Sequence, residues 1–496
     1  MSSQRGLDRQ ICAAALAAVL SCLVPSSAGA AERLASPDYL CFNHAVIHTP
    51  DWDDRRYRQA VEALGAGRVR IPGGTLADYW DWRRGGVVEE GAWPAAETPP
   101  FALEDRRRKG ATPEAIAPFF RDTGAGAIFG LNVFSASLAD EIAALKRAEA
   151  AGLRVDRIQI ANEPYFAEPY MLERFPQPED FAAFAMEALA ALREAFPKAR
   201  IAVPGVVMTA ERFEVSRLAR WNGAMAEAGL YAAADAVFIH PYIGSNLKAI
   251  DAASNALTPA HARQVALWSI PPDDYFLGQA WLTALPPSTA IWITEYNFFE
   301  PAGAERVSGA WLQGLVNLSR ALRWLGDPRI EHACLHQLIG HHGWQALVSR
   351  KGGARSFDEA GRPKEVFDGR PFDLAASGLA LAELGAALGE GGRGGGGAPL
   401  LVTDHPIVDL GRPLIAKRFF RDRAFAGALV VNLSDAPIDV SAAGEGGAFA
   451  EILSAAPWAP AYAPEHVERR AQTVSGRKLI APPFSIVRVS ADVSAR

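Results

Sequence analysis

The chain has 496 residues, of which 49% are hydrophobic and 21% are charged, so a large core can be buried and global disorder is excluded. With 50 basic against 56 acidic residues the net charge is −6, which argues against a nucleic-acid-binding protein. Four Cys residues are too few for a disulfide scaffold or a zinc cluster. The length corresponds to roughly two to four domains, or to one large barrel with a smaller module.

Residues 1–30 have the pattern of a secretory signal peptide. Two arginines precede an apolar run at residues 11–25, and Ala28-Gly29-Ala30 forms a small-x-small cleavage site. The run is too short to span a membrane comfortably, and no later stretch reaches the roughly 18 apolar residues of a membrane span. We therefore predict an exported protein, periplasmic or secreted, without a membrane span. The alternatives are a lipoprotein anchored through Cys22 and a buried N-terminal helix.

Strand-like and helix-like segments alternate from about residue 38 to residue 390. Eight short segments rich in branched or aromatic residues are predicted to be strands: Tyr39–Ile47, Arg68–Ile71, Ala127–Phe134, Arg157–Ala161, Arg200–Val206, Ala236–Ile243, Ala290–Tyr296 and Arg329–Leu338. Amphipathic segments between and after them are predicted to be helices: Asp53–Leu64, Pro113–Asp122, Leu138–Ala151, Pro178–Phe196, Phe213–Ala228, Ser308–Leu325 and Asp373–Leu388. Eight such units predict an α/β fold, the (β/α)8 TIM barrel. The alternative, an open doubly wound sheet, lacks the expected G-x-G-x-x-G after its first strand.

A Gly-rich linker at 391–397 ends the helical pattern. Beyond it, short strand-like segments separated by turn residues indicate an antiparallel β-sandwich: Leu414–Phe420, Ala426–Leu433, Ile438–Ser441, Phe449–Leu453, Val467–Val474, Lys478–Ala481 and Phe484–Val489. The predicted organisation is therefore a catalytic barrel over residues 31–390 and an accessory sandwich over residues 398–496.

Two predicted barrel strands end in a glutamate. Arg157-Ile-Gln-Ile-Ala leads into Asn162-Glu163-Pro164 at strand four, and Ala290-Ile-Trp-Ile leads into Thr294-Glu295-Tyr296-Asn297 at strand seven. The C-terminal strand ends form the active-site face of a barrel, and strands four and seven face each other across it. One such Glu alone is more often a surface or salt-bridged residue. Two facing carboxylates are what glycoside hydrolysis requires, one to protonate the leaving oxygen and one to attack the sugar or activate water.

These two motifs resemble those of the clan A glycoside hydrolases, retaining enzymes built on a (β/α)8 barrel. The resemblance implies that Glu163 is the acid/base, that Glu295 is the nucleophile, and that Asn162 binds the 2-hydroxyl of the sugar. The sandwich resembles the accessory domain of the β-xylosidase, α-L-arabinofuranosidase and β-glucuronidase families. Because no single family's full pattern fits, the exact family, the sugar, the linkage and endo or exo action stay open.

The segment Arg70-Ile-Pro72-Gly73-Gly74 resembles one in the arabinofuranosidase-like and β-glucuronidase-like families. The resemblance implies that Arg70 keeps the nucleophile ionised, and the two glycines would let the backbone approach a ligand closely. The alternative is a tight turn with a surface arginine. Trp80 and Trp82 nearby form either a sugar-stacking platform or a piece of local core.

Other strand ends supply further candidates for substrate binding. Tyr242, after strand six, resembles the clan residue that hydrogen-bonds the nucleophile, and His240 beside it either shapes the subsite or is structural. Asn132, at the end of strand three, is a weaker candidate of the same kind. After strand eight, we expect His336 to point into the barrel mouth and Trp344 to form the floor of the sugar subsite.

The resemblance implies no cofactor and an oligo- or polysaccharide as the partner. A metal-dependent hydrolase is one rival, because His332, His336, His341 and His342 cluster after strand eight. Strand one, however, lacks the His-x-His that metal-dependent barrels often use, so we expect no metal. The other rival is a carbohydrate-binding barrel without activity. The oligomeric state stays open.

Cys41 and Cys334 lie in the first and eighth predicted strands, which are neighbours in a closed barrel. Export would permit a disulfide. Cross-strand pairs often have poor disulfide geometry, so two buried thiols are the favoured interpretation.

Overall fold

The computed structural model describes residues 33–46, 51–88, 110–207, 216–243, 258–270, 274–298, 309–340, 345–348, 355–357, 363–365, 371–389, 400–404, 414–444, 448–459, 461, 464–474 and 478–491. The predicted signal peptide, the linker and Trp344 lie outside these residues. Within the described ranges, no helix combines the length and the apolar character that crossing a membrane requires.

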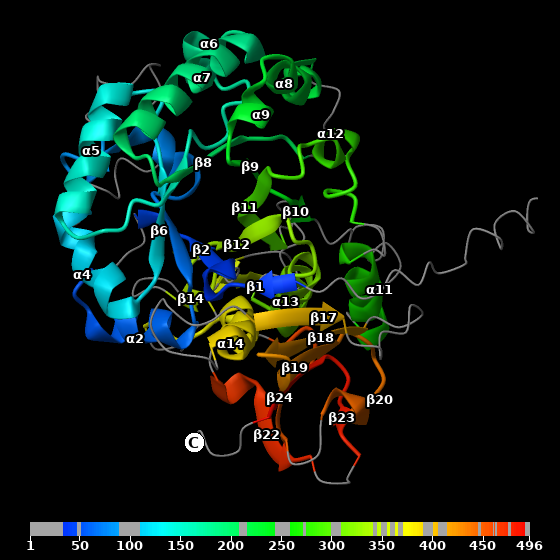
Figure 1. Ribbon diagram of the computed structural model, residues 1–496. Coiled ribbons are helices and arrows are strands. Elements are labelled where there is room, and N and C mark those ends of the chain that lie inside the picture. The colour runs from blue at the N-terminus through cyan, green and yellow to red at the C-terminus, as the bar shows by residue number, and fades with distance from the viewer. Residues whose placement is uncertain are drawn as a thin grey trace, which may run out of the picture. The chain divides into compact units, whose positions relative to one another are not determined.

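Eight parallel strands close into a barrel, as predicted (Figure 1). The closure is complete because β12 pairs with β2 and β9 pairs with β11. Around the barrel the strands are β2 (Leu40–Asn43), β3 (Arg68–Ile71), β6 (Gly126–Gly130), β7 (Arg157–Gln159), β8 (Arg200–Pro204), β9 (Ala236–Ile239), β11 (Ala290–Phe298) and β12 (Ile330–His336). Each predicted strand overlaps one of these eight.

The helices follow the strands in the predicted order and lie around the barrel (Figure 1). The predicted ones correspond to α2 (Arg55–Ala63), α4 (Pro113–Thr123), α5 (Leu138–Ala150), α7 (Pro178–Ala195), α8 (Ser216–Glu227), α13 (Trp311–Trp324) and α14 (Ala376–Gly389). Local chemistry sets their limits. In α4, the Thr112 side chain accepts the Ala115 N–H, Pro113 opens the helix, and Gly124 ends it with φ 72°.

A second, antiparallel sheet has the strand order β1-β17-β18-β19-β24-β21-β22. Its strands are β1 (Arg33–Ala35), β17 (Leu400–Asp404), β18 (Leu414–Arg421), β19 (Ala424–Asn432), β24 (Ser485–Ser490), β21 (Phe449–Ser454) and β22 (Glu468–Thr473). The predicted strands all appear, and two of them form the separate pair β20 (Ile438–Asp439) and β23 (Ile480–Ala481). β1 precedes the barrel in sequence but pairs with β17 in this sheet.

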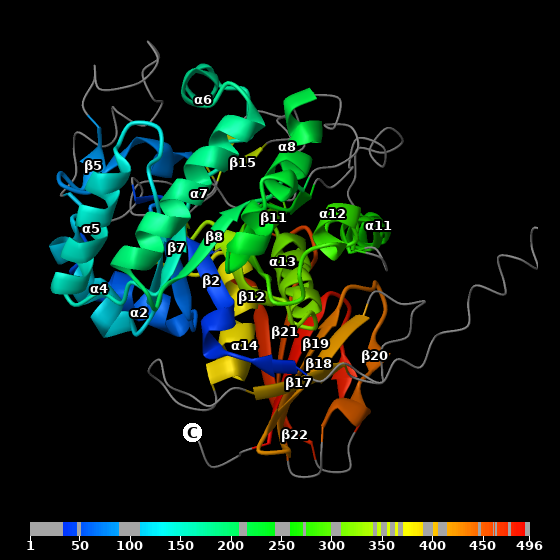
Figure 2. The ribbon, with the colours of Figure 1, turned by 45° about the horizontal axis from the view of Figure 1, so that its top comes forward.

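Two helices of the barrel connect it to this sheet. Figure 2 shows α13 and α14 between the barrel strands and the sheet. Phe419 and Ile486 of the sheet belong to the same buried core as the barrel, whereas Val430 and Val487 belong to a second core with β20 and β23. The sheet is thus covered on both faces, which supports the predicted sandwich.

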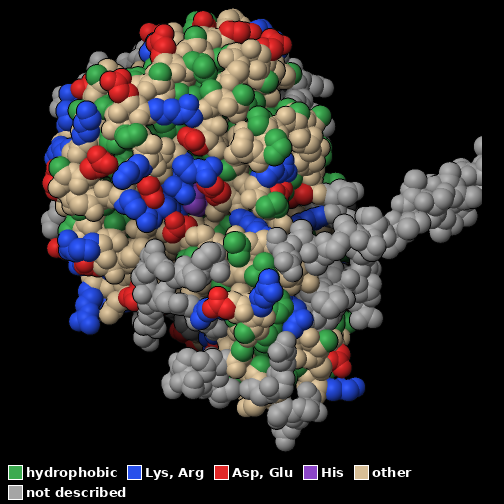
Figure 3. All heavy atoms as spheres, in the orientation of Figure 1, with side chains coloured by type: hydrophobic (Ala, Val, Ile, Leu, Met, Phe, Trp, Pro, Cys, Tyr) green, Lys and Arg blue, Asp and Glu red, His purple; other side chains and the backbone are tan. Residues whose placement is uncertain are grey.

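The surface carries both signs of charge, as the composition implies. Acidic and basic side chains are interspersed over the face shown in Figure 3. Several form ion pairs, such as Arg200 with Glu331 at 2.7 Å and Arg147 with Glu114 at 2.5 Å. Pairs of this kind stabilise a protein by about 0–1 kcal/mol each.

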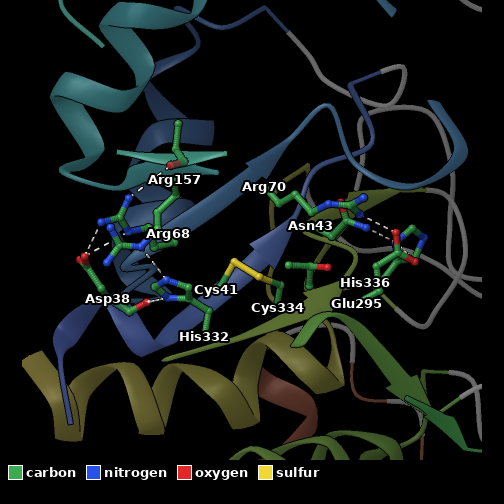
Figure 4. Close-up of a disulfide and its surroundings, with 12 residues drawn as sticks. Asp38, Cys41, Asn43, Arg68, Arg70, Arg157, Glu295, His332, Cys334 and His336 are labelled. Carbon is green, nitrogen blue, oxygen red and sulfur yellow. Dashed lines mark hydrogen bonds and ion pairs between the residues drawn. A yellow bond between two sulfur atoms is a disulfide. The ribbon is translucent and has the colours of Figure 1, made fainter. Parts of the chain in front are cut away.

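A disulfide joins Cys41 of β2 to Cys334 of β12 (Figure 4). The expectation of two free thiols is therefore wrong. Barrel closure places the two residues directly opposite each other in adjacent strands, although 293 positions separate them in sequence. Both side chains are fully buried.

Removal of this disulfide is expected to destabilise the fold. Cys41→Ala combined with Cys334→Ala should lower the free energy of unfolding by roughly 2–4 kcal/mol, because the crosslink restricts the unfolded chain. Urea unfolding without reductant measures the change. Cys41→Ala alone should lower the free energy of unfolding by as much as the double variant, because it also removes the crosslink. Equal stability of wild type and double variant, or alkylation of both cysteines in denatured but unreduced protein, would contradict the crosslink.

Candidate active site

Polar side chains from six strands or strand ends meet at one end of the barrel. The strands are parallel, so their C-terminal ends share this end. The strand register places Arg70, Asn43 and His336 side by side across β3, β2 and β12. Figure 4 shows these three with Glu295, at the opposite end of the strands from Arg68 and His332.

Glu295 is the buried carboxylate of the site, with 4% of its surface exposed. Arg70 donates from Nη1 to Glu295 Oε1 at 2.6 Å. The Tyr242 hydroxyl donates to Oε2 at 2.7 Å. Both oxygens therefore have a donor, and the carboxylate is held in one orientation. The predicted neighbours of Glu295, Arg70 and Tyr242, do contact it.

The surroundings of Glu295 favour its ionised form. Burial raises the pKa of this carboxyl, but the charges of His240, His336 and Arg70 and the Tyr242 hydrogen bond outweigh burial, so the pKa lies below its ordinary value. Burial also lowers the pKa of His336, so this ring carries its positive charge only at lower pH than an ordinary imidazole. Arg70 is then the permanent positive charge that keeps Glu295 ionised.

Glu163 has a more open environment, because its side chain is 19% exposed. The Tyr165 hydroxyl donates to Glu163 Oε1 at 2.7 Å, and His240 Nδ1 lies 2.9 Å from the same oxygen. His240 Nε2 is 3.0 Å from Thr294 Oγ1, which fixes the ring between two strand ends. His240 thus contacts the predicted acid/base directly.

The two glutamates lie close together. His240 Nδ1 is 2.9 Å from Glu163 Oε1 and 3.9 Å from Glu295 Oε2, so these oxygens are no further apart than the sum of the two distances. That limit lies at the lower end of the roughly 6.5–9.5 Å of inverting glycosidases and allows the roughly 5–5.5 Å of retaining ones.

Asn162 joins the same network. Its Oδ1 accepts a hydrogen bond from Arg70 Nη2 at 2.7 Å. Arg70 therefore connects the residue before Glu163 with Glu295, and it is fully buried while doing so. A single guanidinium holds both predicted catalytic segments in register, a task suited to its planar set of donors.

The Gly73-Gly74 pair lets the chain pass close to the site. Gly74 has φ +69°, and a Cβ there would lie 3.2 Å from His336 Cε1 and 3.9 Å from Glu295 Oε1. A Cβ on Gly73 would lie 1.6 Å from Asn43 Oδ1, an impossible contact. Asn43 also hydrogen-bonds His336 Nδ1. These contacts account for both glycines.

Trp80, Trp82 and Asn132 form a buried cluster. The two indoles pack edge to face with ring centroids 6.0 Å apart, and the centroids of the Trp82 and Phe129 rings are 5.9 Å apart. Asn132 donates to the Trp80 carbonyl at 3.0 Å and accepts the Ser135 N–H at 2.9 Å. The indole rings pack against protein, and the Asn132 side chain fixes a loop.

The histidines after strand eight do not form one group. His332 lies at the other end of β12 from His336 (Figure 4), where it contacts the Asp38 carbonyl at 2.9 Å. Among the residues that the structure describes, no group of three His, Cys, Asp or Glu side chains could hold a metal ion. His341 and His342 lie outside the described residues.

Four residues of the site were not predicted from the sequence: Asn43, Asp78, Tyr165 and Thr294. Tyr165 and Thr294 are within two positions of a predicted glutamate, so their place in a strand-end motif was an available signal. Asn43 and Asp78 have no such signal, because only barrel closure and the 3-10 helix Gly74–Tyr79 bring them to the site.

Comparisons with known proteins agree on the fold. No protein-family model matches the chain, and no curated protein matches it in sequence. A family 51 α-L-arabinofuranosidase from Bifidobacterium longum matches with a TM-score of 0.63 and 16% identity, over 92% of this chain and 96% of that one. The family 51 arabinofuranosidase of Xanthomonas axonopodis pv. citri has a TM-score of 0.59 and 15% identity, over 92% and 98%.

The same matches include an enzyme named for a different sugar. A 4-O-α-L-rhamnosyl-β-D-glucuronidase from Fusarium oxysporum 12S has a TM-score of 0.55 and 14% identity, over 93% of this chain and 98% of that one. These structures cover the barrel and the sandwich together. The chain therefore has the fold of the clan A glycoside hydrolases that its motifs resemble.

Proposed function

We propose that this protein is an exported retaining glycoside hydrolase that cleaves O-glycosidic bonds of an oligo- or polysaccharide. The pairing of Glu295 with Glu163 carries the proposal. One carboxylate is buried and held ionised by Arg70, and the other is partly exposed and bound by His240. Two nearby carboxyl groups in such different environments are suited to the separate tasks of nucleophile and acid/base.

In the proposed reaction Glu295 attacks the anomeric carbon while Glu163 protonates the leaving oxygen. A covalent glycosyl-enzyme forms, and Glu163, now ionised, takes a proton from the water that hydrolyses it. Asn162, held by Arg70, is placed to bind the sugar 2-hydroxyl. All of these steps use side chains of this chain and need no cofactor.

Export is supported by two independent features. Residues 1–30 have the signal-peptide pattern, and the buried Cys41–Cys334 disulfide is typical of proteins from oxidising compartments. N-terminal sequencing of protein recovered from the periplasm or medium should give Ala31 as the first residue. An N-terminus blocked at Cys22 would indicate a lipoprotein instead.

The activity is tested with a panel of aryl glycosides: β-xyloside, α-L-arabinofuranoside, β-glucoside and β-glucuronide. The solved structures with this fold include arabinofuranosidases, a rhamnosyl-glucuronidase and a xyloglucanase, so the panel spans several sugars. Turnover of one member with retained configuration is the expected result. If the protein hydrolyses neither the panel nor polysaccharides but binds oligosaccharides, it is a binding protein instead.

Tyr242→Phe is expected to lower kcat by roughly 10–100-fold, because a hydrogen bond to a charged group stabilises it by about 1.5–3 kcal/mol. In the wild type, the hydrogen bond from Tyr242 lowers the pKa of Glu295. The variant lacks this bond, so the pKa of Glu295 should rise and the acidic limb of the kcat/KM profile should move to higher pH. An unchanged limb would contradict the contact, and Tyr275→Phe, an exposed tyrosine, is the control.

A further inference from the structure

A third carboxyl group, that of Asp78, interacts electrostatically with both glutamates and has no part in the proposed reaction. Asp78 belongs to a 3-10 helix, Gly74–Tyr79, which follows Arg70 and β3. Its side chain is fully buried. The Tyr170 hydroxyl donates to Asp78 Oδ2 at 3.0 Å, and Oδ1 has no hydrogen-bond partner among the described residues.

The charges around Asp78 oppose its ionisation. Burial raises its pKa, and the Tyr170 hydrogen bond lowers it; the charges of Glu163 and Glu295 raise it further, and only Arg70 among these groups opposes them. The pKa of Asp78 lies well above its ordinary value as a result. Arg70 already binds Glu295 and Asn162. The uncharged form of Asp78 is therefore favoured more strongly than that of an ordinary aspartate.

The hydrogen bond between Asp78 and Tyr170 joins the two segments that carry the site. The Asp78 segment begins at Gly74, where a Cβ would lie 3.2 Å from His336 Cε1 and 3.9 Å from Glu295 Oε1. Tyr170 lies in α6 (Pro169–Arg174), which follows Glu163 in sequence. The phenol ring is itself packed, against Tyr79 at 5.2 Å and Phe134 at 5.1 Å.

We propose that Asp78 is a positioning residue whose hydrogen bond to Tyr170 sets the place of Glu163 relative to Glu295. The inference rests on the proposed glycosidase function. Asp78 touches neither reacting atom, so it acts through the placement of the acid/base. A buried group whose role is to accept one hydrogen bond can be replaced by an amide, but not by a methyl group.

The test compares Asp78→Asn and Asp78→Ala on two glycosides of the sugar that the wild type cleaves. One has a dinitrophenyl leaving group, which departs with little protonation, and the other a methylphenyl group, which needs Glu163. Asp78→Ala should lose about 10–100-fold in kcat/KM on the second, because misplacement of a catalytic group by about 1 Å has effects of this size. On the dinitrophenyl glycoside, Asp78→Ala should lose less than about threefold in kcat/KM. Asp78→Asn should stay within about threefold of wild type on both.

Equal losses on both substrates would overturn the proposal, since lost stability alone does not depend on the leaving group. An Asp78→Asn variant as poor as Asp78→Ala would overturn it as well, because a charge would then be required. Tyr170→Phe removes the same hydrogen bond and serves if Asp78→Ala does not fold. Glu141→Gln is the matched control: burial raises the pKa of Glu141 to about 8, and its carboxyl binds only the Asn132 N–H at 3.2 Å in the described structure.

A structural readout separates this proposal from that of the glycosidase. In crystal structures of wild type and Asp78→Ala, Glu163 should move away from Glu295 by about 1 Å in the variant and keep its place in Asp78→Asn. This result does not require any turnover. A Glu163 that stays in place in Asp78→Ala would overturn the positioning role even in an active enzyme, whereas an inactive wild type would overturn the proposed function alone.

Discussion

Glu295→Ala is expected to lower kcat by on the order of 10⁴-fold or more on any glycoside that the wild type cleaves. The proposed reaction has no second nucleophile, because Glu163 is required as the acid and Asp78 touches no reacting atom. The substitution also leaves the donors of Arg70 and Tyr242 without their acceptor inside a buried site. Some loss of stability is therefore expected alongside the loss of activity.

The two effects are separated by a second variant and a control. Glu295→Gln keeps a carbonyl oxygen for Arg70 and should be folded but equally inactive. Glu331→Ala removes a glutamate from the opposite end of the same barrel, where it pairs with Arg200 at 2.7 Å, and should keep wild-type kcat. Thermal unfolding of the three variants measures their stability, and kcat measured below their unfolding transitions shows the loss of activity separately. Activity of Glu295→Gln within tenfold of wild type would contradict the assigned nucleophile.

The strand-end motifs allowed the main features of the site to be predicted. A buried strand followed by a polar residue is a local pattern, and eight of them in sequence imply closure, which in turn places strands four and seven across one mouth. Glu163 and Glu295 were predicted in this way, because each follows a buried strand directly. Arg70 and Tyr242 were predicted from the resemblance of their segments to those of the clan A families.

Features that depend on distant parts of the chain could not be predicted in the same way. β1 belongs to the second sheet only because β17 lies beside it, and neither strand has a periodic pattern of its own. The disulfide depends on which residues of β2 and β12 face each other, a matter of register that a shift of one residue would change. Asp78 gives no sign of its role in sequence, because its partner Tyr170 is 92 positions away.

The two tryptophans illustrate a different limit. Trp80 and Trp82 follow the Gly73-Gly74 segment, where a sugar platform and a piece of core have the same sequence pattern. The structure packs both rings, with 1% and 3% of their surfaces exposed. Aromatic residues carry both roles because their large faces are apolar, so exposure, which the sequence does not encode locally, decides between them.

Glu163→Ala is expected to give a loss that depends on the leaving group. On a methylphenyl glycoside, which needs the acid, kcat/KM should fall by roughly 10²–10⁴-fold, whereas a dinitrophenyl glycoside should be affected far less in the first step. The second step, attack of water, loses its base in either case. The glycosyl-enzyme on Glu295 should therefore accumulate and appear as a burst of released phenol followed by slow turnover.

Azide distinguishes this variant from one that is merely damaged. The small anion needs no base, so it should enter the space left by the carboxylate, restore turnover of the dinitrophenyl glycoside and yield a glycosyl azide of retained configuration. Glu168→Ala, an exposed glutamate in the same segment, should show neither burst nor rescue. A glycosyl azide of inverted configuration would mean that azide attacks the substrate itself. Glu163 would then face Glu295 as the acid of an inverting pair, and the close approach of the two carboxyls through His240 would need another explanation.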